Sequence, residues 1–174
     1  MRSPFANCEA HIVKEQRTIK FRGDEYAYVY SCYECDQTKE RFTTTEMDEE
    51  NVQQVYRQYR TKYGIPSSEE ITELKDKYGV SAARLALILG FGENQISNYI
   101  DGEVPNKANG KTLSAIKDPR VFIRYVELAK EQLKASVYEK LMSSLQEIIH
   151  SCSYDDNCEH PTMVAEEIAE YGRS

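Results

Sequence analysis

Residues 82–102, AARLALILGFGENQISNYIDG, have the spacing that is typical of two short helices crossing steeply at a tight turn. Ala86 has no bulky side chain to block the second helix, and Gly90 permits a turn with positive φ. Ile96 and Tyr99, three residues apart, predict the buried face of the second helix. The stretch therefore predicts a helix-turn-helix; the alternative is an ordinary helical hairpin within a core.

The outer face of the predicted second helix carries three amide side chains, those of Asn94, Gln95 and Asn98. Amides of Asn and Gln can form paired hydrogen bonds with adenine in the major groove of DNA. Phosphate contacts position a protein on DNA without reading its sequence, and the candidates for them are Ser81, Arg84, Lys107 and Lys111. The pattern predicts a regulator that binds double-stranded DNA. Because one short helix makes few base contacts, we expect a homodimer on a palindromic site.

The formal net charge of −7 is unusual for a DNA-binding protein, but the charge is unevenly distributed. Residues 147–170 contain seven acidic residues and no Lys or Arg, so the rest of the chain is neutral overall. Residues 105–120 contain four cations and one acid. Charges farther apart than a Debye length of about 8 Å are screened at physiological salt. The acidic tail is therefore compatible with a locally basic DNA-binding surface.

Composition also bounds the compartment and the chemistry. No apolar run approaches the roughly 20 residues of a membrane helix, and no secretory leader opens the chain. Five cysteines, an odd number, fit a reducing compartment better than a closed disulfide framework. We therefore expect a cytoplasmic protein with no membrane partner. The sequence has no phosphate-binding glycine loop and no Ser/His/Asp set that the pattern brings together, so we expect no enzymatic activity.

The whole chain predicts an α+β fold. Residues 1–64 are expected to form a β-rich module that binds a partner and includes a linking helix. Its predicted strands lie at 12–13, 18–21, 26–30 and 41–45, with a turn at 22–24 and the helix from Thr45 to Gly64. Residues 67–134 are expected to form the helix-turn-helix DNA-binding domain. Residues 135–174 are expected to form a helical, acidic C-terminal extension.

Local signals divide the helical part further. Two capping boxes are predicted, Ser67 with Glu70 and Ser136 with Glu139. Asn109-Gly110 is interpreted as the end of a loop before a helix that reaches about Lys117, and Asp118-Pro119 as the start of the next helix. A break is expected near Ala135. After it, an apolar stripe of Leu141, Leu145 and Ile148 forms either core or a dimer seam.

The chain resembles the MqsA-type (YgiT-like) antitoxins, which have an Xre/HigA-like helix-turn-helix. The resemblance covers about residues 1–130 and rests on the stretches 3–5, 42–46, 63–66, 78–81, 89–99 and 101–102. By position, Asn94 and Asn98 match the family's base-contacting pair, although an arginine is familiar at position 98. Ala82 and Ile100 replace a common Gln and Glu. The resemblance implies an antitoxin that sequesters a cognate toxin and represses its own operon as a dimer.

The family also holds a structural zinc with two CxxC pairs, and the cysteines of this chain depart from that pattern. Cys32 and Cys35 match the second pair, but Ser3 and Ala6 stand where the first pair belongs. We therefore expect no metal or other cofactor, and interpret the module as zinc-finger-like in shape but metal-free. The alternative is a shifted zinc site with a Cys3His ligand set, formed by Cys8, His11, Cys32 and Cys35.

Three functional hypotheses remain open. The first is the repressor and antitoxin of a type II toxin–antitoxin pair. The second is a stand-alone helix-turn-helix regulator whose N-terminal module senses a metal or mediates protein association. A third reading is a protein-interaction module whose helix-turn-helix no longer binds DNA.

Overall fold

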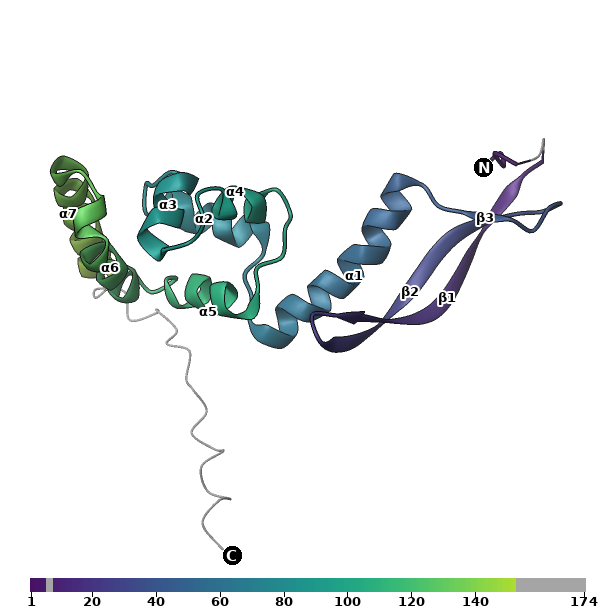
Figure 1. Ribbon diagram of the computed structural model, residues 1–174, viewed down its shortest axis with the longest axis horizontal. Helices are drawn as coiled ribbons and strands as arrows, with labels where there is room; N and C mark the ends of the chain where they lie inside the picture. Colours follow the sequence, from purple (N-terminus) through teal and green to yellow (C-terminus); the bar gives the residue numbers. More distant parts are fainter. Residues whose placement is uncertain (6–7, 153–174) are drawn as a thin grey trace, which may run out of the picture.

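The computed structural model describes residues 1–5 and 8–152, so most of the predicted acidic tail lies outside the described residues. The fold is α+β, as predicted: a three-stranded antiparallel sheet precedes seven α-helices in the described part of the chain (Figure 1). The N-terminal module contains β1 (Ala10–Phe21), β2 (Asp24–Cys35), β3 (Arg41–Phe42) and α1 (Thr45–Tyr63). The helical domain contains α2 (Ser68–Lys77), α3 (Ala82–Leu89), α4 (Gln95–Ile100), α5 (Lys107–Ala115), α6 (Pro119–Leu128) and α7 (Ala135–Cys152).

The strands β1 and β2 form one long hairpin, in which every residue from Ala10 to Phe21 pairs with a residue of β2. Arg22 and Gly23 both have positive φ, 50° and 96°, which is the backbone geometry that tight antiparallel hairpins favour. The predicted turn is therefore confirmed. The strands predicted for this hairpin were too short, because the polar residues between the apolar runs continue the strand with exposed side chains. The strand predicted at 41–45 was too long: β3 ends at Phe42, because Thr44 caps α1.

The helix α1 lies along the free edge of β2 and attaches to it through amide side chains. The Asn51 amide accepts from Ser31 N–H at 2.8 Å and donates to Ser31 C=O at 2.9 Å. The Gln54 amide makes the same pair of hydrogen bonds with Val29, both at 3.0 Å. One helical turn farther on, Gln58 donates to Ala27 C=O. These amides satisfy backbone groups that a further strand would otherwise pair.

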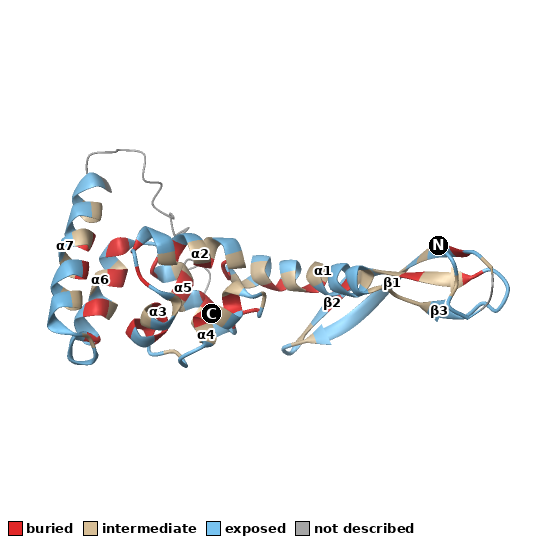
Figure 2. Cartoon of the chain, turned by 90° about the horizontal axis from the view of Figure 1, so that it is seen from above, coloured by how far each residue is buried: buried red, intermediate tan, exposed pale blue. Residues whose placement is uncertain are grey.

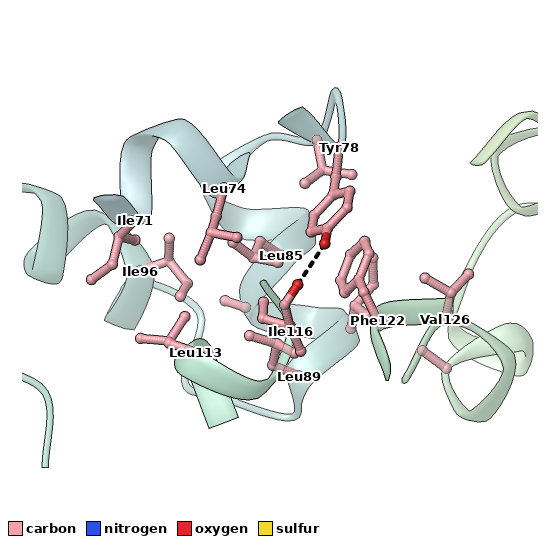
Figure 3. Packing of buried hydrophobic residues seen from close by; sticks show 14 of the residues in the cluster. Ile71, Leu74, Tyr78, Leu85, Leu89, Ile96, Leu113, Ile116, Phe122 and Val126 are labelled. Atoms are coloured by element: carbon pink, nitrogen blue, oxygen red, sulfur yellow. Dashed lines mark hydrogen bonds between the residues drawn. The ribbon is translucent and has the colours of Figure 1, made fainter. Parts of the chain in front are cut away.

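The core of the helical domain is formed by apolar residues from α2 to α7 (Figure 3). The capping box of Ser67 and Glu70, the Ser81 cap of α3 and the Asp118-Pro119 start of α6 are all present as predicted. A 3₁₀ turn at Lys130–Gln132 confirms the break before Ala135. Leu141 and Leu145 are buried in this core, so the stripe on α7 is core rather than a free seam.

The helix α1 begins at Thr45 as predicted, and Thr44 caps it, because the Thr44 side chain accepts the N–H of Met47. One prediction about a helix start was wrong. The second capping box is absent: α7 begins at Ala135, and Val137 N–H already donates to Lys134 C=O, so Ser136 lies within the first turn. None of the described helices is long and apolar enough to cross a membrane.

The tip of the hairpin and the end of α1 join the N-terminal module to the helical domain. Tyr26, Val55 and Tyr59 of the module form a buried cluster with Ile65 and Val104. In addition, the Arg22 guanidinium donates to Val104 C=O at 2.6 Å and to Pro105 C=O at 2.5 Å. The rest of the hairpin projects away from the helical domain, so the molecule is elongated (Figure 2).

The prediction that a helix begins after Gly110 was also wrong. The helix α5 is capped by Asn106, and Gly110 lies inside it. A Cβ atom at position 110 would come within 2.6 Å of Ile65 Cγ1, so glycine is required there for close packing against Ile65. This glycine therefore reports a contact between α5 and the segment that follows α1, and it does not mark a turn.

We expect Gly110→Ala to lower the free energy of unfolding by about 1 kcal/mol. Overpacking destabilises the fold by about 1–3 kcal/mol. The better helix propensity of alanine offsets about 1 kcal/mol of this loss. The cost persists because Ile65 is β-branched and cannot move its Cγ1 atom freely. The measurement is urea denaturation, with Gly92→Ala as the control because no atom lies within 4 Å of a Cβ added there. Unchanged or increased stability of the Gly110 variant would contradict the close packing.

Candidate nucleic-acid interface

The helices α3 and α4 and the turn between them lie where the sequence predicted them. Ser81 caps α3, and Gly90 ends it with a φ of 69°. Ala86 is buried where α3 meets α4, and Phe91 N–H donates to its carbonyl at 2.9 Å. Ile96 and Tyr99 are 0% and 1% exposed, so the predicted inner face of α4 is confirmed as core.

Further hydrogen bonds fix α4 on its neighbours. The Ser68 hydroxyl on α2 donates to Tyr99 C=O at 2.8 Å. The Asn109 amide on α5 donates to the Tyr99 hydroxyl at 2.8 Å. Burial raises the pKa of Tyr99, so this phenol stays neutral. The six-residue helix is therefore held on both sides, and its outer face has a defined orientation.

The three predicted amides differ in how free they are. Asn94, at the N-cap of α4, and Asn98, one turn later, are exposed, and the Asn94 side chain makes no capping hydrogen bond. Gln95 is half-buried, and its amide donates to Glu103 Oε1 at 3.3 Å. Asn94 and Asn98 are therefore open to a ligand, whereas Gln95 has an intramolecular partner that DNA would have to replace.

Acidic residues near α4 form part of the same surface, and the sequence reasoning did not weigh them. Glu93, Asp101 and Glu103 are all exposed and lie within a few residues of the helix. Glu93 and Asp101 lie within the quoted stretch and Glu103 directly follows it, and these positions were the signal that could have revealed them. Because carboxylates repel phosphates, sequence-independent binding of DNA to this surface should be weak.

The predicted phosphate-binding residues lie in two places. The Ser81 hydroxyl is exposed and accepts Arg84 N–H at 3.2 Å, while the Arg84 side chain is half-buried on α3. Lys107 and Lys111 belong to α5, which Figure 1 shows below α2, α3 and α4. Lys111 is exposed and has no ion pair among the residues that the structure describes. Lys107 Nζ lies 3.7 Å from Asp24 Oδ2 and 4.0 Å from the centre of the Tyr63 ring, so it already contributes to the junction between the modules.

Asp24 is the centre of a polar network at that junction. It accepts hydrogen bonds from Tyr63 Oη at 2.5 Å, Lys62 Nζ at 3.0 Å and Tyr26 Oη at 3.3 Å. The Tyr63 hydrogen bond, followed by that of Lys62 and the charge of Lys107, lowers the pKa of Asp24 to about 2. No short motif in the sequence marks this residue, because three of its partners, Lys62, Tyr63 and Lys107, come from α1 and α5.

We expect Asp24 to stabilise the fold in a pH-dependent manner. Its pKa falls from an ordinary 3.8 to about 2 on folding, so the contribution is complete above about pH 4 and disappears as the pH falls toward 2. Asp24→Asn should lower the melting temperature at pH 7, and the gap to wild type should narrow between pH 4 and 2. Glu25→Gln, at an exposed neighbour, is the control. A gap that stays constant with pH would exclude this role.

The structure does not bring all four residues of the alternative zinc site together. Cys8 Sγ lies 2.9 Å from Cys35 Sγ, whereas thiolates on one tetrahedral zinc ion lie roughly 3.8 Å apart. The His11 ring is paired instead with Asp36, at 2.6 Å between Nδ1 and Oδ1. Within residues 1–5 and 8–152, no group of three His, Cys, Asp or Glu residues is arranged to hold a metal ion. The geometry therefore does not fit the Cys3His site.

A comparison of the sequence with protein-family models and with curated proteins finds no match. The resemblance to the MqsA-type antitoxins therefore rests on the residues quoted for it.

Proposed function

We propose that the protein is a sequence-specific DNA-binding transcriptional repressor and that α4 is its recognition helix. The observation that carries this proposal is the contrast between the two faces of α4. Ile96 and Tyr99 hold one face in the core, and Asn94 and Asn98 present free amides on the other. A rigidly placed amide can form paired hydrogen bonds with adenine at little entropic cost.

The charges around α4 favour discrimination over general affinity for DNA. Arg84, beside the cap of α3, and the exposed Ser81 hydroxyl are suited to one or two phosphate contacts. The nearby carboxylates oppose binding wherever base contacts do not compensate. Two copies of the helix on a palindrome would double the base contacts, so the proposed DNA-binding form is a homodimer. The function is binding, with no catalytic step.

We further propose that the protein is the antitoxin of a type II pair and that the N-terminal module binds the toxin. The hairpin supports this proposal because it projects away from the helical domain (Figure 1). In the described sheet, β1 is an edge strand whose only partner strand is β2. Its first residue, Ala10, also forms a backbone hydrogen bond with Met1. Such an edge can accept a strand from a partner protein. Ile12, Ile19 and Val29 are exposed on the hairpin and would add apolar contacts.

The proposed sequence-specific DNA binding is tested with a labelled duplex from the region upstream of the gene. Fluorescence anisotropy at fixed salt should show tighter binding to this duplex than to a scrambled duplex of the same composition. Footprinting should then show two protected half-sites about 34–36 Å apart. Equal affinity for both duplexes would overturn sequence-specific recognition.

The antitoxin arm is tested separately by co-expression with the product of the adjacent gene. We expect a stable complex, and we expect growth arrest when the neighbour is expressed alone. Specific DNA binding without such a complex would instead support a stand-alone regulator, in which the exposed edge of β1 mediates a different association.

A further inference from the structure

The N-terminal segment is docked on the far end of the hairpin through its backbone. Ser3 N–H donates to Cys8 C=O at 3.0 Å, and Ala10 N–H donates to Met1 C=O at 2.8 Å. Asp36 N–H, just after β2, donates to Glu9 C=O at 3.1 Å. These hydrogen bonds hold Cys8 against the end of β2.

The partner thiol, Cys35, is held on its own side by the turn that leads to β3. Cys35 N–H donates to Glu40 C=O at 2.9 Å, and Lys39 N–H donates to Cys35 C=O at 3.0 Å. Thr38 N–H points at Cys35 Sγ, at 3.5 Å. The side chain of Cys35 is fully buried, and that of Cys8 is half-buried. The two sulfurs are therefore brought within 2.9 Å of each other by segments that are fixed independently.

The electrostatics of the pair suit thiol chemistry. Hydrogen bonds from Cys8, then Ser3 and Thr38, lower the pKa of Cys35 to about 6. The same Cys8–Cys35 hydrogen bond raises the pKa of Cys8. Cys35 is therefore the more acidic of the two thiols. The hydrogen bond between the two sulfurs gives the Cys8 proton a path to Cys35.

We propose that Cys8 and Cys35 are a redox-active pair that a hydroperoxide converts into a reversible disulfide, and that this disulfide locks the N-terminal segment onto the hairpin. The proposal is independent of DNA and toxin binding. The sulfurs need to approach by less than 1 Å to reach an S–S bond length of about 2.05 Å. Both are free thiols in the structure.

The reaction balances with hydrogen peroxide as the oxidant. As the Cys8 sulfur, which solvent can reach, attacks one peroxide oxygen, its proton passes to the Cys35 thiolate; the O–O bond breaks, hydroxide leaves, and Cys8 becomes a sulfenic acid. The hydroxide takes the proton from Cys35 and becomes water. The Cys35 thiolate then attacks the Cys8 sulfur, the S–S bond forms, and the S–OH bond breaks to release a second hydroxide, which is protonated by solvent. The two sulfurs lose two electrons, and the peroxide gains them.

The third cysteine of the module provides a matched control. Cys32 is as fully buried as Cys35 and pairs with Val13 in the hairpin. Because successive residues of a strand alternate between its two faces, Cys32 and Cys35 lie on opposite faces of β2. It should not join the disulfide. Cys32→Ala should therefore keep the cross-link, whereas Cys8→Ser and Cys35→Ser should each abolish it.

The experiment treats the full-length reduced protein with a small excess of hydrogen peroxide and then alkylates it under denaturing conditions. The number of alkylated cysteines should fall from five to three, and peptide mapping should find Cys8 linked to Cys35. Dithiothreitol should restore all five. The oxidised wild type should also melt at a higher temperature than the reduced protein, and Cys8→Ser should show no such shift.

Three results would overturn the proposal. One is a cross-link that joins Cys32 to either partner. Another is oxidation of Cys8 or Cys35 to sulfinic acid with no cross-link. The third is one equivalent of zinc in the purified protein that protects both thiols from alkylation, since this would make them metal ligands. Because the readouts involve neither DNA nor a partner, they are separate from the tests of the proposed function.

Discussion

Replacing Phe122 with alanine is expected to lower the free energy of unfolding by about 3–5 kcal/mol, which is the usual cost of emptying a buried aromatic site. Phe122 is 0% exposed, and its ring stacks on Tyr78 with the centres 4.2 Å apart (Figure 3). The Tyr78 hydroxyl in turn donates to Ile116 C=O at 2.5 Å. The substitution therefore removes one of the buried contacts that attach α6 to the rest of the helical core.

The matched control for this substitution lies on the same helix. Leu128 is 82% exposed, so Leu128→Ala should change the stability by less than about 0.5 kcal/mol. Both variants are measured by urea denaturation, with circular dichroism as the signal. If Phe122→Ala cost no more than Leu128→Ala, the packing of α6 on the core would be contradicted.

The second large effect is expected at the proposed recognition helix. Asn94→Ala and Asn98→Ala should each weaken binding to the specific duplex by about 1–3 kcal/mol, or roughly 5- to 150-fold, for each paired contact that is lost. Both side chains are exposed, so the variants should keep the melting temperature of the wild type. The measurement is a gel-shift titration at fixed salt on the specific and scrambled duplexes.

The pattern across the two duplexes distinguishes base contacts from phosphate contacts. Loss of a base contact should weaken binding to the specific duplex and leave the scrambled duplex unchanged. Arg84→Ala should weaken binding to both duplexes by a similar factor and reduce the salt dependence. Gln146→Ala, an exposed amide on α7, serves as the control that should alter neither. If both Asn variants prefer the specific duplex over the scrambled duplex as strongly as the wild type does, α4 is not the recognition helix.

Much of the helical domain was predictable from the sequence, because the decisive interactions are local. Ser67 and Ser81 begin their helices by accepting backbone N–H groups three residues later. Gly90 ends α3 because its own backbone takes positive φ. Ile96 and Tyr99 are buried as their spacing predicts, since helical periodicity places them on one face.

Only the tertiary structure decided the features whose partners are distant along the chain. Gly110 looked like a turn residue, but Ile65 leaves no room for a Cβ atom there. No sequence pattern distinguishes Asn51 and Gln54 from other polar residues of the helix, but their side chains form hydrogen bonds with the backbone edge of β2. The pairing of Lys107 with Asp24 likewise joins residues of separate modules.

The sequence alone therefore determined where most helices begin and end and which face of α4 is buried, because hydrogen bonds and periodicity within a few residues control these properties. The tertiary structure decided how the modules meet, which amides remain free for a ligand, and that Cys8 lies beside Cys35 and not in a four-ligand metal site. These outcomes depend on distances between segments, and segments separated by dozens of residues leave no short-range pattern from which such distances could be predicted.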